Sequence, residues 1–343
     1  MNKIPEAFVM LTAAKMLLPH RFPVILLIGL LLAWPLTAAA EASSIRVAAL
    51  KFGTLNWELN TIKEQGLDRA QGFELQVIPL AGLSATRTAL LSDSADVIVA
   101  DWIWVNRQRQ QGQALQFVPF STAIGKVVLG HDSGIRSLAD LRGKRLGIAG
   151  GAASKGWLLL QARAQQLGFD LKGETEQQFG APPLLNAALE QGRVDAVITF
   201  WHYAARLEAK GYPVLIDLKS ISAELGLRTD LPMLGFVFKQ AWAEQHPQLV
   251  TGLQRASREA KTYLQAQDAG WQSLRPLMKA DDDQVFEQLR LGYLAGIPGP
   301  IETQQIDDAA RMFALLYRVG GPQLMGRTDG FDRAGFWGAD GGR

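Results

Sequence analysis

The chain has 343 residues, of which 48% are hydrophobic and 20% charged, a globular composition long enough for two domains. Its formal net charge is +2, and no basic patch is interleaved with aromatic residues, so we expect no nucleic-acid partner. The chain has no cysteine, which excludes disulfides, thiolate zinc sites, iron–sulfur clusters, cysteine nucleophiles and a lipid-modified cysteine.

Residues 1–40 predict a secretory signal peptide. Three basic residues precede an apolar run at 24–36, and Thr37-Ala38-Ala39-Ala40 provides an Ala-x-Ala cleavage site before Glu41. The run is shorter than the roughly 20 residues of a membrane span. A retained anchor is the alternative, because the basic region is long. Without residues 1–40 the chain has 32 basic and 32 acidic residues. We therefore expect a protein exported to the periplasm.

Short apolar strands alternate with helices in a first block of the remaining chain. The expected strands lie at 45–50, 73–79 and 96–100. The expected helices follow them at 55–65, 84–91 and 102–111. Such alternation is typical of a mostly parallel sheet with helices on its faces.

The same rhythm restarts after Pro119. Expected strands lie at 126–129, 144–149, 174–179, 194–199 and 214–217, and expected helices at 137–141, 154–167 and 182–191. An extended segment at 233–238 then precedes three helices, at 248–267, 280–295 and 302–319. We therefore expect an α/β protein of two lobes, each a mostly parallel sheet flanked by helices, with the C-terminal helices on the first lobe.

The expected division of the chain follows from these blocks. Lobe 1 would comprise residues 41–122 and lobe 2 residues 123–232. The chain would return to lobe 1 over 233–319, and a flexible, glycine-rich tail would follow at 320–343. The two crossings between the lobes would lie at 119–126 and 231–237.

Three motifs stand before expected strands. They are Asp93-Ser94-Ala95-Asp96-Val97, Ser137-Leu138-Ala139-Asp140-Leu141-Arg142-Gly143-Lys144, and Ala188-Leu189-Glu190-Gln191-Gly192-Arg193-Val194-Asp195-Ala196. In this order, over about residues 45–297, they resemble the periplasmic substrate-binding proteins of ABC importers, in the nitrate/sulfonate/taurine group. The resemblance implies the two-lobed type II fold of periplasmic binding proteins. It also implies hinge closure on one small-molecule ligand, and delivery to an inner-membrane ABC permease driven by a cytoplasmic ATPase. We expect a monomer without cofactor or metal.

Ligands of open parallel sheets bind beyond the carboxyl ends of the strands. That rule selects five loops, whose candidate ligand-binding residues are Thr54, Asn56, Trp57, Gly82, Ser84, Asp101, Trp102, Gly150, Gly151, Ser154, Thr199, Trp201 and His202. Ser121 and Thr122, at the first crossing, are candidates for the hinge or the site. The remaining histidines show no metal-binding spacing.

The glycine loop before Ser154 would let backbone amides at a helix N-terminus approach a carboxylate or sulfonate. An ordinary tight turn is the alternative. Trp57, Trp102 and Trp201 would sandwich a planar, apolar or cationic group, or else pack helices onto the sheet edge. Asp101 would bind an amine, or else cap the next helix.

The ligand class therefore stays open between a sulfonate- or taurine-like anion and an aromatic or amine compound. Lys155 is expected to be solvated, with a role beside the glycine loop as the alternative. Two other functions remain open on this fold, an enzyme of the thiamine-precursor or menaquinone-pathway type and a sensor or accessory protein. The predicted signal peptide and the absence of a Gly-x-Ser-x-Gly motif weigh against an enzyme.

Overall fold

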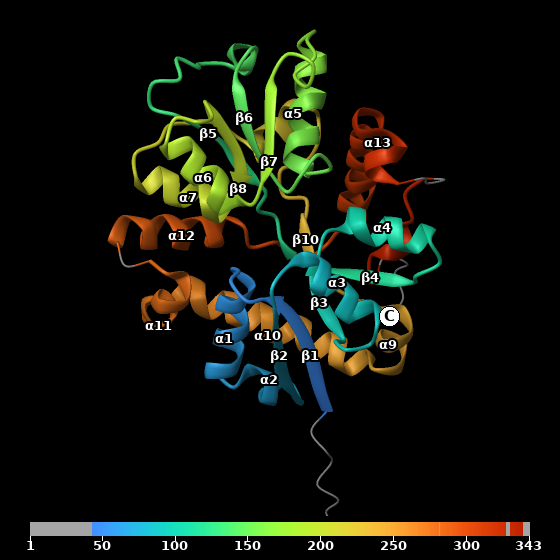
Figure 1. Cartoon of the computed structure of the whole chain (residues 1–343). Helices are drawn as coiled ribbons and strands as arrows, with labels where there is room; N and C mark the ends of the chain where they lie inside the picture. The colour runs from blue at the N-terminus through green and yellow to red at the C-terminus, as the bar shows by residue number, and fades with distance from the viewer. Residues whose placement is uncertain (1–42, 281, 327–329, 339–343) are drawn as a thin grey trace, which may run out of the picture. The chain divides into compact units, whose positions relative to one another are not determined.

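Two mixed sheets with flanking helices make up the computed structural model, which describes residues 43–280, 282–326 and 330–338 (Figure 1). The predicted signal peptide lies outside these residues. In strand order, the first sheet contains β2 (Phe73–Leu80), β1 (Ser43–Leu50), β3 (Val97–Ala100), β10 (Leu234–Lys239) and β4 (Leu115–Ser121). The second contains β7 (Glu176–Gly180), β6 (Arg145–Ala149), β8 (Ala196–Phe200), β5 (Gly125–Leu129) and β9 (Val214–Asp217).

The two sheets share one layout. In the first sheet β1 is parallel to β2 and β3, whereas β10 is antiparallel to β3 and β4. In the second, β6 is parallel to β7 and β8, whereas β5 is antiparallel to β8 and β9. In each sheet the reversed strand is thus the first one after the chain crosses from the other sheet. The crossings touch, because the Met233 N–H donates to the Ser121 carbonyl (2.8 Å).

Most helices follow the strands as expected. The first lobe, meaning the first sheet with its own helices, has α1 (Leu55–Glu64), α2 (Leu67–Ala70), α3 (Leu83–Leu91), α4 (Trp102–Gln110), α9 (Gln240–Gln245), α10 (Pro247–Ala266) and α11 (Asp268–Met278). The second lobe has the 3₁₀ turn η1 (Leu138–Leu141), α5 (Lys155–Gln166), α6 (Pro182–Glu190), α7 (Trp201–Ala209) and α8 (Leu218–Glu224). Two further helices, α12 (Asp283–Ala295) and α13 (Thr303–Met325), come last, before the 3₁₀ turn η2 (Arg333–Gly335).

Two of the three motifs hold the amino ends of the sheets. Arg46, in β1, forms a two-oxygen ion pair with Asp96 (2.6 Å), which stands just before β3. Arg145, at the start of β6, forms the same pair with Asp195 (2.6 Å), just before β8. Each aspartate lies 50 residues after its arginine. The third motif forms the predicted capping box between Ser137 and Asp140. These residues shape the fold and lie at the edge opposite the carboxyl ends of the parallel strands.

The C-terminal helices pack on both lobes, whereas the sequence predicted that they pack on the first lobe alone. Helices α10 and α11 pack on α1 of the first lobe, as expected. Helix α12, however, packs along α7 of the second lobe, and α13 packs against α5 as well as α4 (Figure 1). One apolar cluster continues from Trp57 in α1 through Trp271 and Leu289 to Ala205 in α7. Burial of this shared surface therefore holds the lobes together.

The end of the chain is packed, so the prediction of a flexible tail after residue 319 is wrong for the described residues. Helix α13 continues to Met325 across a kink at Gly321. Phe336 is 2% exposed and its ring lies 5.1 Å from that of Phe117 in β4. Glycine content alone did not reveal these aromatic anchors. Within the described ranges no helix is long and apolar enough to cross a membrane.

The sequence analysis missed several elements, such as the short helix α8, and three of them have a local reason. Strand β4 contains Pro119, a residue that is rare inside strands. Helix α11 contains Pro276, which sequence reasoning treats as a helix breaker. Helix α7 opens with the aromatic run Trp201-His202-Tyr203, which has low helix propensity. Packing against neighbours decides all three.

Gly292 sets how closely α12 approaches the second lobe. A Cβ at this position would lie 2.7 Å from the Trp201 ring. We expect Gly292→Ala to lower the free energy of unfolding by about 1–3 kcal/mol, because the rigid indole cannot retreat without breaking its packing. Gly299→Ala is the control, since its Cβ would meet nothing within 4 Å. Urea denaturation measures both, and equal midpoints would contradict the close contact.

Candidate functional site

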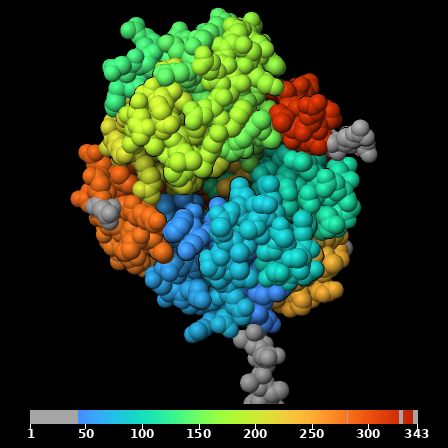
Figure 2. Space-filling model, in the orientation of Figure 1, coloured from blue at the N-terminus to red at the C-terminus, as the bar shows by residue number. Residues whose placement is uncertain are grey.

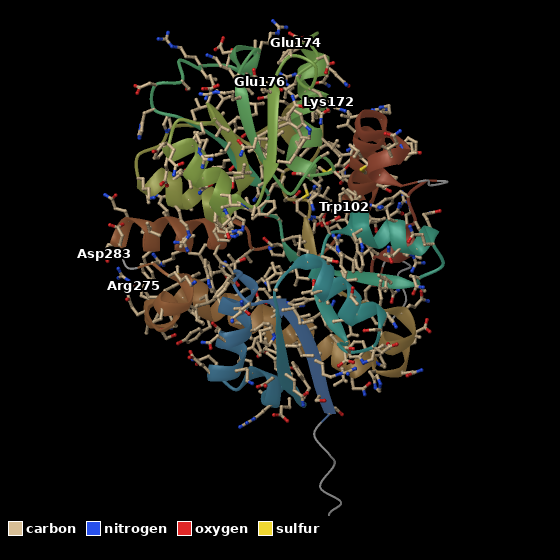
Figure 3. The ribbon with its side chains drawn as sticks, in the orientation of Figure 1. Trp102, Lys172, Glu174, Glu176, Arg275 and Asp283 are labelled. Carbon is tan, nitrogen blue, oxygen red and sulfur yellow. The ribbon has the colours of Figure 1, made fainter. Side chains whose placement is uncertain are left out.

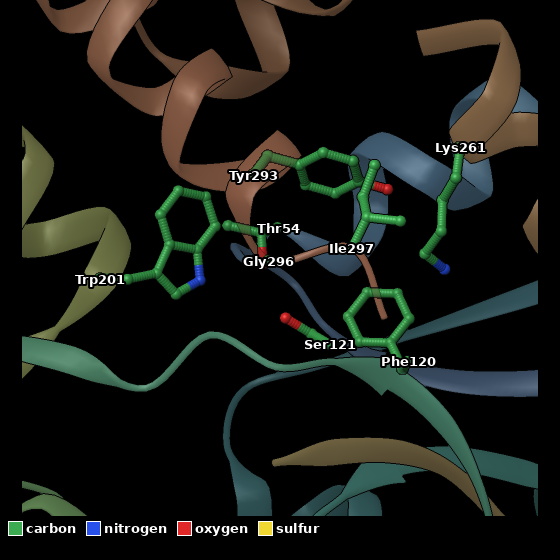
Figure 4. A pocket seen from close by; sticks show the side chains of 8 residues that line it. All are labelled: Thr54, Phe120, Ser121, Trp201, Lys261, Tyr293, Gly296 and Ile297. Carbon is green, nitrogen blue, oxygen red and sulfur yellow. The ribbon is translucent and has the colours of Figure 1, made fainter. Parts of the chain in front are cut away.

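A pocket lies beside the crossings, with walls from both lobes (Figure 4). It is lined by Thr54, Phe120, Ser121, Trp201, Lys261, Tyr293, Gly296 and Ile297. The space between these side chains has room for about one water molecule. The surface is hollowed between the blue-to-teal atoms of the first lobe and the green-to-yellow atoms of the second (Figure 2). The interlobe pocket as it stands has no room for a larger molecule.

Hydrogen-bond donors converge in the interlobe pocket. The indole nitrogen of Trp201 faces the side on which Thr54 and Ser121 lie (Figure 4). Neither the Trp201 indole N–H nor the Thr54 hydroxyl bonds to any other described residue. The Ser121 hydroxyl oxygen accepts a bond from the Ala123 N–H (3.1 Å), which leaves its own O–H to donate elsewhere. Three donors from two lobes are thus available to one oxygen-rich group.

Two helices begin at the interlobe pocket, one in each lobe. Helix α1 starts after Thr54, and α7 starts after Phe200. In neither helix does the N-cap side chain bond to a backbone N–H. The Asn56 N–H of α1 donates to the Gly53 carbonyl (3.1 Å) and the Trp201 N–H of α7 to the Ile124 carbonyl (3.4 Å), so the dipole of each helix, more than its first amide, supplies the positive potential. A helix N-terminus carries about half a positive charge on its unpaired amides. Two such ends at one pocket favour an anion.

The structure brings Trp57 and Trp201 together but not Trp102. The Trp57 and Trp201 rings meet edge to face across the lobes, with centroids 6.0 Å apart. Only Trp201 lines the pocket, because Trp57 is 3% exposed and packs against Trp271. Trp102, labelled in Figure 3, is 1% exposed, and its indole N–H donates to the Pro232 carbonyl (2.9 Å). The alternative of helix packing therefore describes Trp57 and Trp102.

The glycine loop has the backbone that the sequence predicts. Gly150 and Gly151 both have positive φ, +85° and +80°, which other residues rarely adopt. The Ser154 N–H closes the turn on the Gly151 carbonyl (3.0 Å). The Ser154 hydroxyl makes no capping bond, so the N-terminus of α5 is also uncapped. The loop is a tight turn, and Gly150, Gly151 and Ser154 do not line the interlobe pocket. Their part in ligand binding stays a prediction.

Asp101 both caps a helix and joins the lobes. Its Oδ1 accepts the Trp104 N–H (2.9 Å), and its Oδ2 lies 3.9 Å from Lys155 Nζ and 3.7 Å from the Arg87 guanidinium. Burial by itself would raise the pKa of Asp101, but Lys155, the Trp104 N–H and Arg87 outweigh it and hold the pKa below its ordinary value. Lys155 also donates to the Met233 carbonyl (3.2 Å), so it is not the solvated lysine expected.

The other candidates stand apart from the interlobe pocket. Asn56 donates to the Leu50 carbonyl (2.8 Å) and so fixes the loop after β1. Thr199 is 2% exposed inside β8. Gly82 is the N-cap residue of α3, and Ser84 is exposed in the first turn of that helix. None of these four side chains is among those that line the pocket.

Residues 59–269, more than half of the chain, match the family model described as NMT1/THI5 like. The chain belongs to the NMT1/THI5-like family. No curated protein sequence is significantly similar to it.

Solved structures share the fold of this family member at low sequence identity. The alkanesulfonate-binding protein SsuA from Xanthomonas axonopodis pv. citri, bound to MOPS, is 19% identical with a TM-score of 0.69, over 87% of this chain and 99% of that one. The periplasmic aliphatic sulphonate binding protein SsuA from Escherichia coli is 18% identical with a TM-score of 0.66, over 83% and 94%. The desulfurization enzyme DszB is 17% identical with a TM-score of 0.57, over 80% and 92%. The predicted two-lobed fold is therefore confirmed.

Sequence reasoning missed a buried charged cluster beneath the pocket of this NMT1/THI5-like protein. Lys261 Nζ lies 2.8 Å from Glu58 Oε2 and donates to the Ser257 hydroxyl (2.7 Å). Tyr293 donates its hydroxyl to the same glutamate (2.7 Å), and the Lys261 ammonium lies 4.7 Å from the centre of the Phe120 ring. Burial and the Glu58 charge raise the pKa of Tyr293 well above its usual range. The signal available was a lysine on the apolar stripe of α10.

His202 is a neutral side chain in this fold. Its Nδ1 is buried and has no hydrogen-bond partner among the described residues. Burial, with the nearby Arg206 charge, lowers the pKa of His202 to about 3. It therefore adds no positive charge to the start of α7. No group of three or more potential metal ligands occurs within the described part of the chain.

The buried imidazole should make stability depend on pH. Because the unfolded chain takes up this proton near pH 6.5 and the folded chain only near pH 3, the contribution of His202 is complete above pH 6.5 and is lost as the pH falls toward 3. By pH 5 the loss amounts to about 2 kcal/mol. Urea titrations at pH 7.5 and pH 5 measure the free energy of unfolding. This free energy should change less between the two pH values for His202→Gln than for the wild type. His131→Gln, at an exposed histidine, is the control, and equal slopes for all three proteins would contradict the burial.

Proposed function

We propose that this NMT1/THI5-like protein is a periplasmic solute-binding receptor of an ABC importer. It captures a small organic anion, of the sulfonate or taurine-like kind, in the interlobe pocket and delivers it to an inner-membrane permease with its ATPase. The observation that carries the proposal is the meeting of two uncapped helix N-termini, one from each lobe, at a pocket with free hydroxyl and indole donors.

The charges and walls of the pocket favour an anion over an amine. Lys261 and Glu58 neutralise one another, and the helix ends then supply the remaining positive potential. The Asp101 carboxylate, the group expected to bind an amine, already faces Lys155 and Arg87. Aromatic rings of Phe120, Tyr293 and Trp201 offer contact to an apolar body attached to the anion.

Two further points support this receptor role. The solved structures that share the fold include proteins described as alkanesulfonate-binding and aliphatic sulphonate binding, one of them bound to the sulfonate MOPS. The predicted signal peptide agrees with a location of the protein in the periplasm. The same fold also occurs in DszB, solved in complex with biphenyl-2-sulfinic acid, so an enzyme is the competing function. Genes for a permease and an ATPase beside this one would favour import over an enzyme or a sensor.

Two substitutions each remove one hydrogen-bond donor from the pocket. Trp201→Phe deletes the indole N–H, and Thr54→Val replaces a hydroxyl by a methyl group. We expect each to weaken the binding of ethanesulfonate or MOPS about tenfold, the effect of one hydrogen bond to a charged group. Isothermal titration measures the affinities.

The matched control for these variants is Trp242→Phe, an aromatic replacement in α9 that does not line the pocket. It should bind the sulfonates as the wild type does. If both pocket variants bind the sulfonates with wild-type affinity, the interlobe pocket is not the sulfonate site. Consumption of the sulfonate during the titration, detected by mass spectrometry, would instead point to an enzyme.

Binding should also change the spacing of the lobes. The interlobe pocket admits about one water, so a sulfonate can enter only an opened form, on which the lobes then close. We expect small-angle X-ray scattering to give a smaller radius of gyration with saturating ligand than without it. An identical profile at saturation would show that the receptor does not close about a hinge.

A further inference from the structure

A second hollow lies where α6 and α7 meet α12, three helices that run side by side in Figure 1. It has a volume of about 290 Å³, near the lower end of the range for small-molecule pockets. None of its lining residues lines the interlobe pocket. The hollow is therefore a separate feature, and the receptor role proposed above does not account for it.

Arg206 brings a poorly compensated positive charge to this hollow. Its Nη1 and Nη2 donate to the carbonyls of Lys279 (3.1 Å) and Met278 (2.5 Å), at the C-terminus of α11. No carboxylate among the described residues forms an ion pair with it. A helix C-terminus offers about half a negative charge, so part of the guanidinium charge stays unbalanced. Burial lowers the pKa of Arg206, which is the expected response of a half-buried cation without a counter-ion.

The other charged groups of the hollow cancel one another. Lys210 is paired with Glu190 (2.6 Å), so these two add no net charge and leave a single cation. A single negative charge is enough to balance it. Two neutral hydrophobic residues, Ala187 and Val285, form part of the wall. The hollow thus combines one cation with apolar surface.

One more polar group in the hollow lacks a partner. Asn186 lines the hollow and is 8% exposed, and its amide nitrogen donates to the Tyr203 carbonyl (3.0 Å). Its Oδ1 is buried without a hydrogen-bond partner in the described structure. Buried side-chain oxygens are nearly always paired in folded proteins. Asn186 thus lies at the wall of the hollow, but its Oδ1 is an acceptor that a carboxylate cannot use, so the positive charge in the wall comes from Arg206.

We propose that the hollow between α6, α7 and α12 is a second ligand site, which binds a small monocarboxylate with an apolar or aromatic body. The carboxylate pairs with the Arg206 guanidinium, and the body lies against Ala187 and Val285. The concave shape and the size of the hollow suit a free small molecule. Because α12 also packs against α7 next to the interlobe pocket, a ligand here contacts the helix that joins the lobes.

Benzoate is the probe, titrated calorimetrically into the purified protein. Ala187→Phe places a ring in the hollow and leaves Arg206 untouched, and Arg206→Gln removes the charge. Each should weaken benzoate binding at least about tenfold. The matched controls are Ala269→Phe, at an exposed position of α11, and Arg193→Gln, at an exposed arginine of the second lobe, and both should bind as the wild type does.

Arg206→Gln also removes the bonds to the end of α11, so its fold is checked by circular dichroism. Ala187→Phe decides the outcome if that variant unfolds. The proposal is wrong if the wild type shows no saturable binding below about 10 mM benzoate, or if Ala187→Phe binds benzoate normally. Loss of benzoate binding in Thr54→Val together with normal binding in Ala187→Phe would place benzoate in the interlobe pocket and also overturn it.

Discussion

The structure depends on apolar packing that passes from one lobe to the other through α12. The Trp57 ring of the first lobe meets the Trp201 ring of the second, and Gly292 lets α12 lie directly against that second ring. On the other flank α13 touches both α4 and α5. The lobes are therefore joined by more than the two crossings of the chain. Separating the lobes would expose these apolar surfaces to water, so their packing stabilises the arrangement seen here.

The candidate residues between the lobes fall into two groups. Strand ends of both sheets point to one interlobe region, as the alternation of strands and helices predicted. Within it, Thr54, Ser121 and Trp201 gather at one pocket, whereas Asp101, Lys155 and Arg87 form a separate charged contact between the lobes. The first group leaves hydrogen-bond donors available in the pocket, and the second connects the lobes. A list of loops could not separate these two roles.

The features that the sequence predicted correctly depend on residues that are neighbours along the chain. The strands of both sheets except β4, the capping box at Ser137 and the positive φ at Gly150 and Gly151 all follow from neighbouring residues. What it hid depends on contacts between distant segments. Trp102 follows a strand end just as Trp201 does, yet its indole is bound to the Pro232 carbonyl, 130 residues away. Lys261 pairs with Glu58 across about 200 positions, and only the apolar stripe around the lysine hinted at a buried partner.

The two sheets differ in how their strands follow one another along the chain, and this difference has a consequence for the order of folding. The second sheet is built from one continuous stretch, β5 to β9, so all its strand pairings are available early. The first sheet is interrupted, because β10 must insert between β3 and β4 after the whole second lobe has been added. Until then β3 and β4 are open edges with unpaired backbone groups. The second lobe is thus able to complete itself first, while the first lobe waits for a long-range, slow pairing.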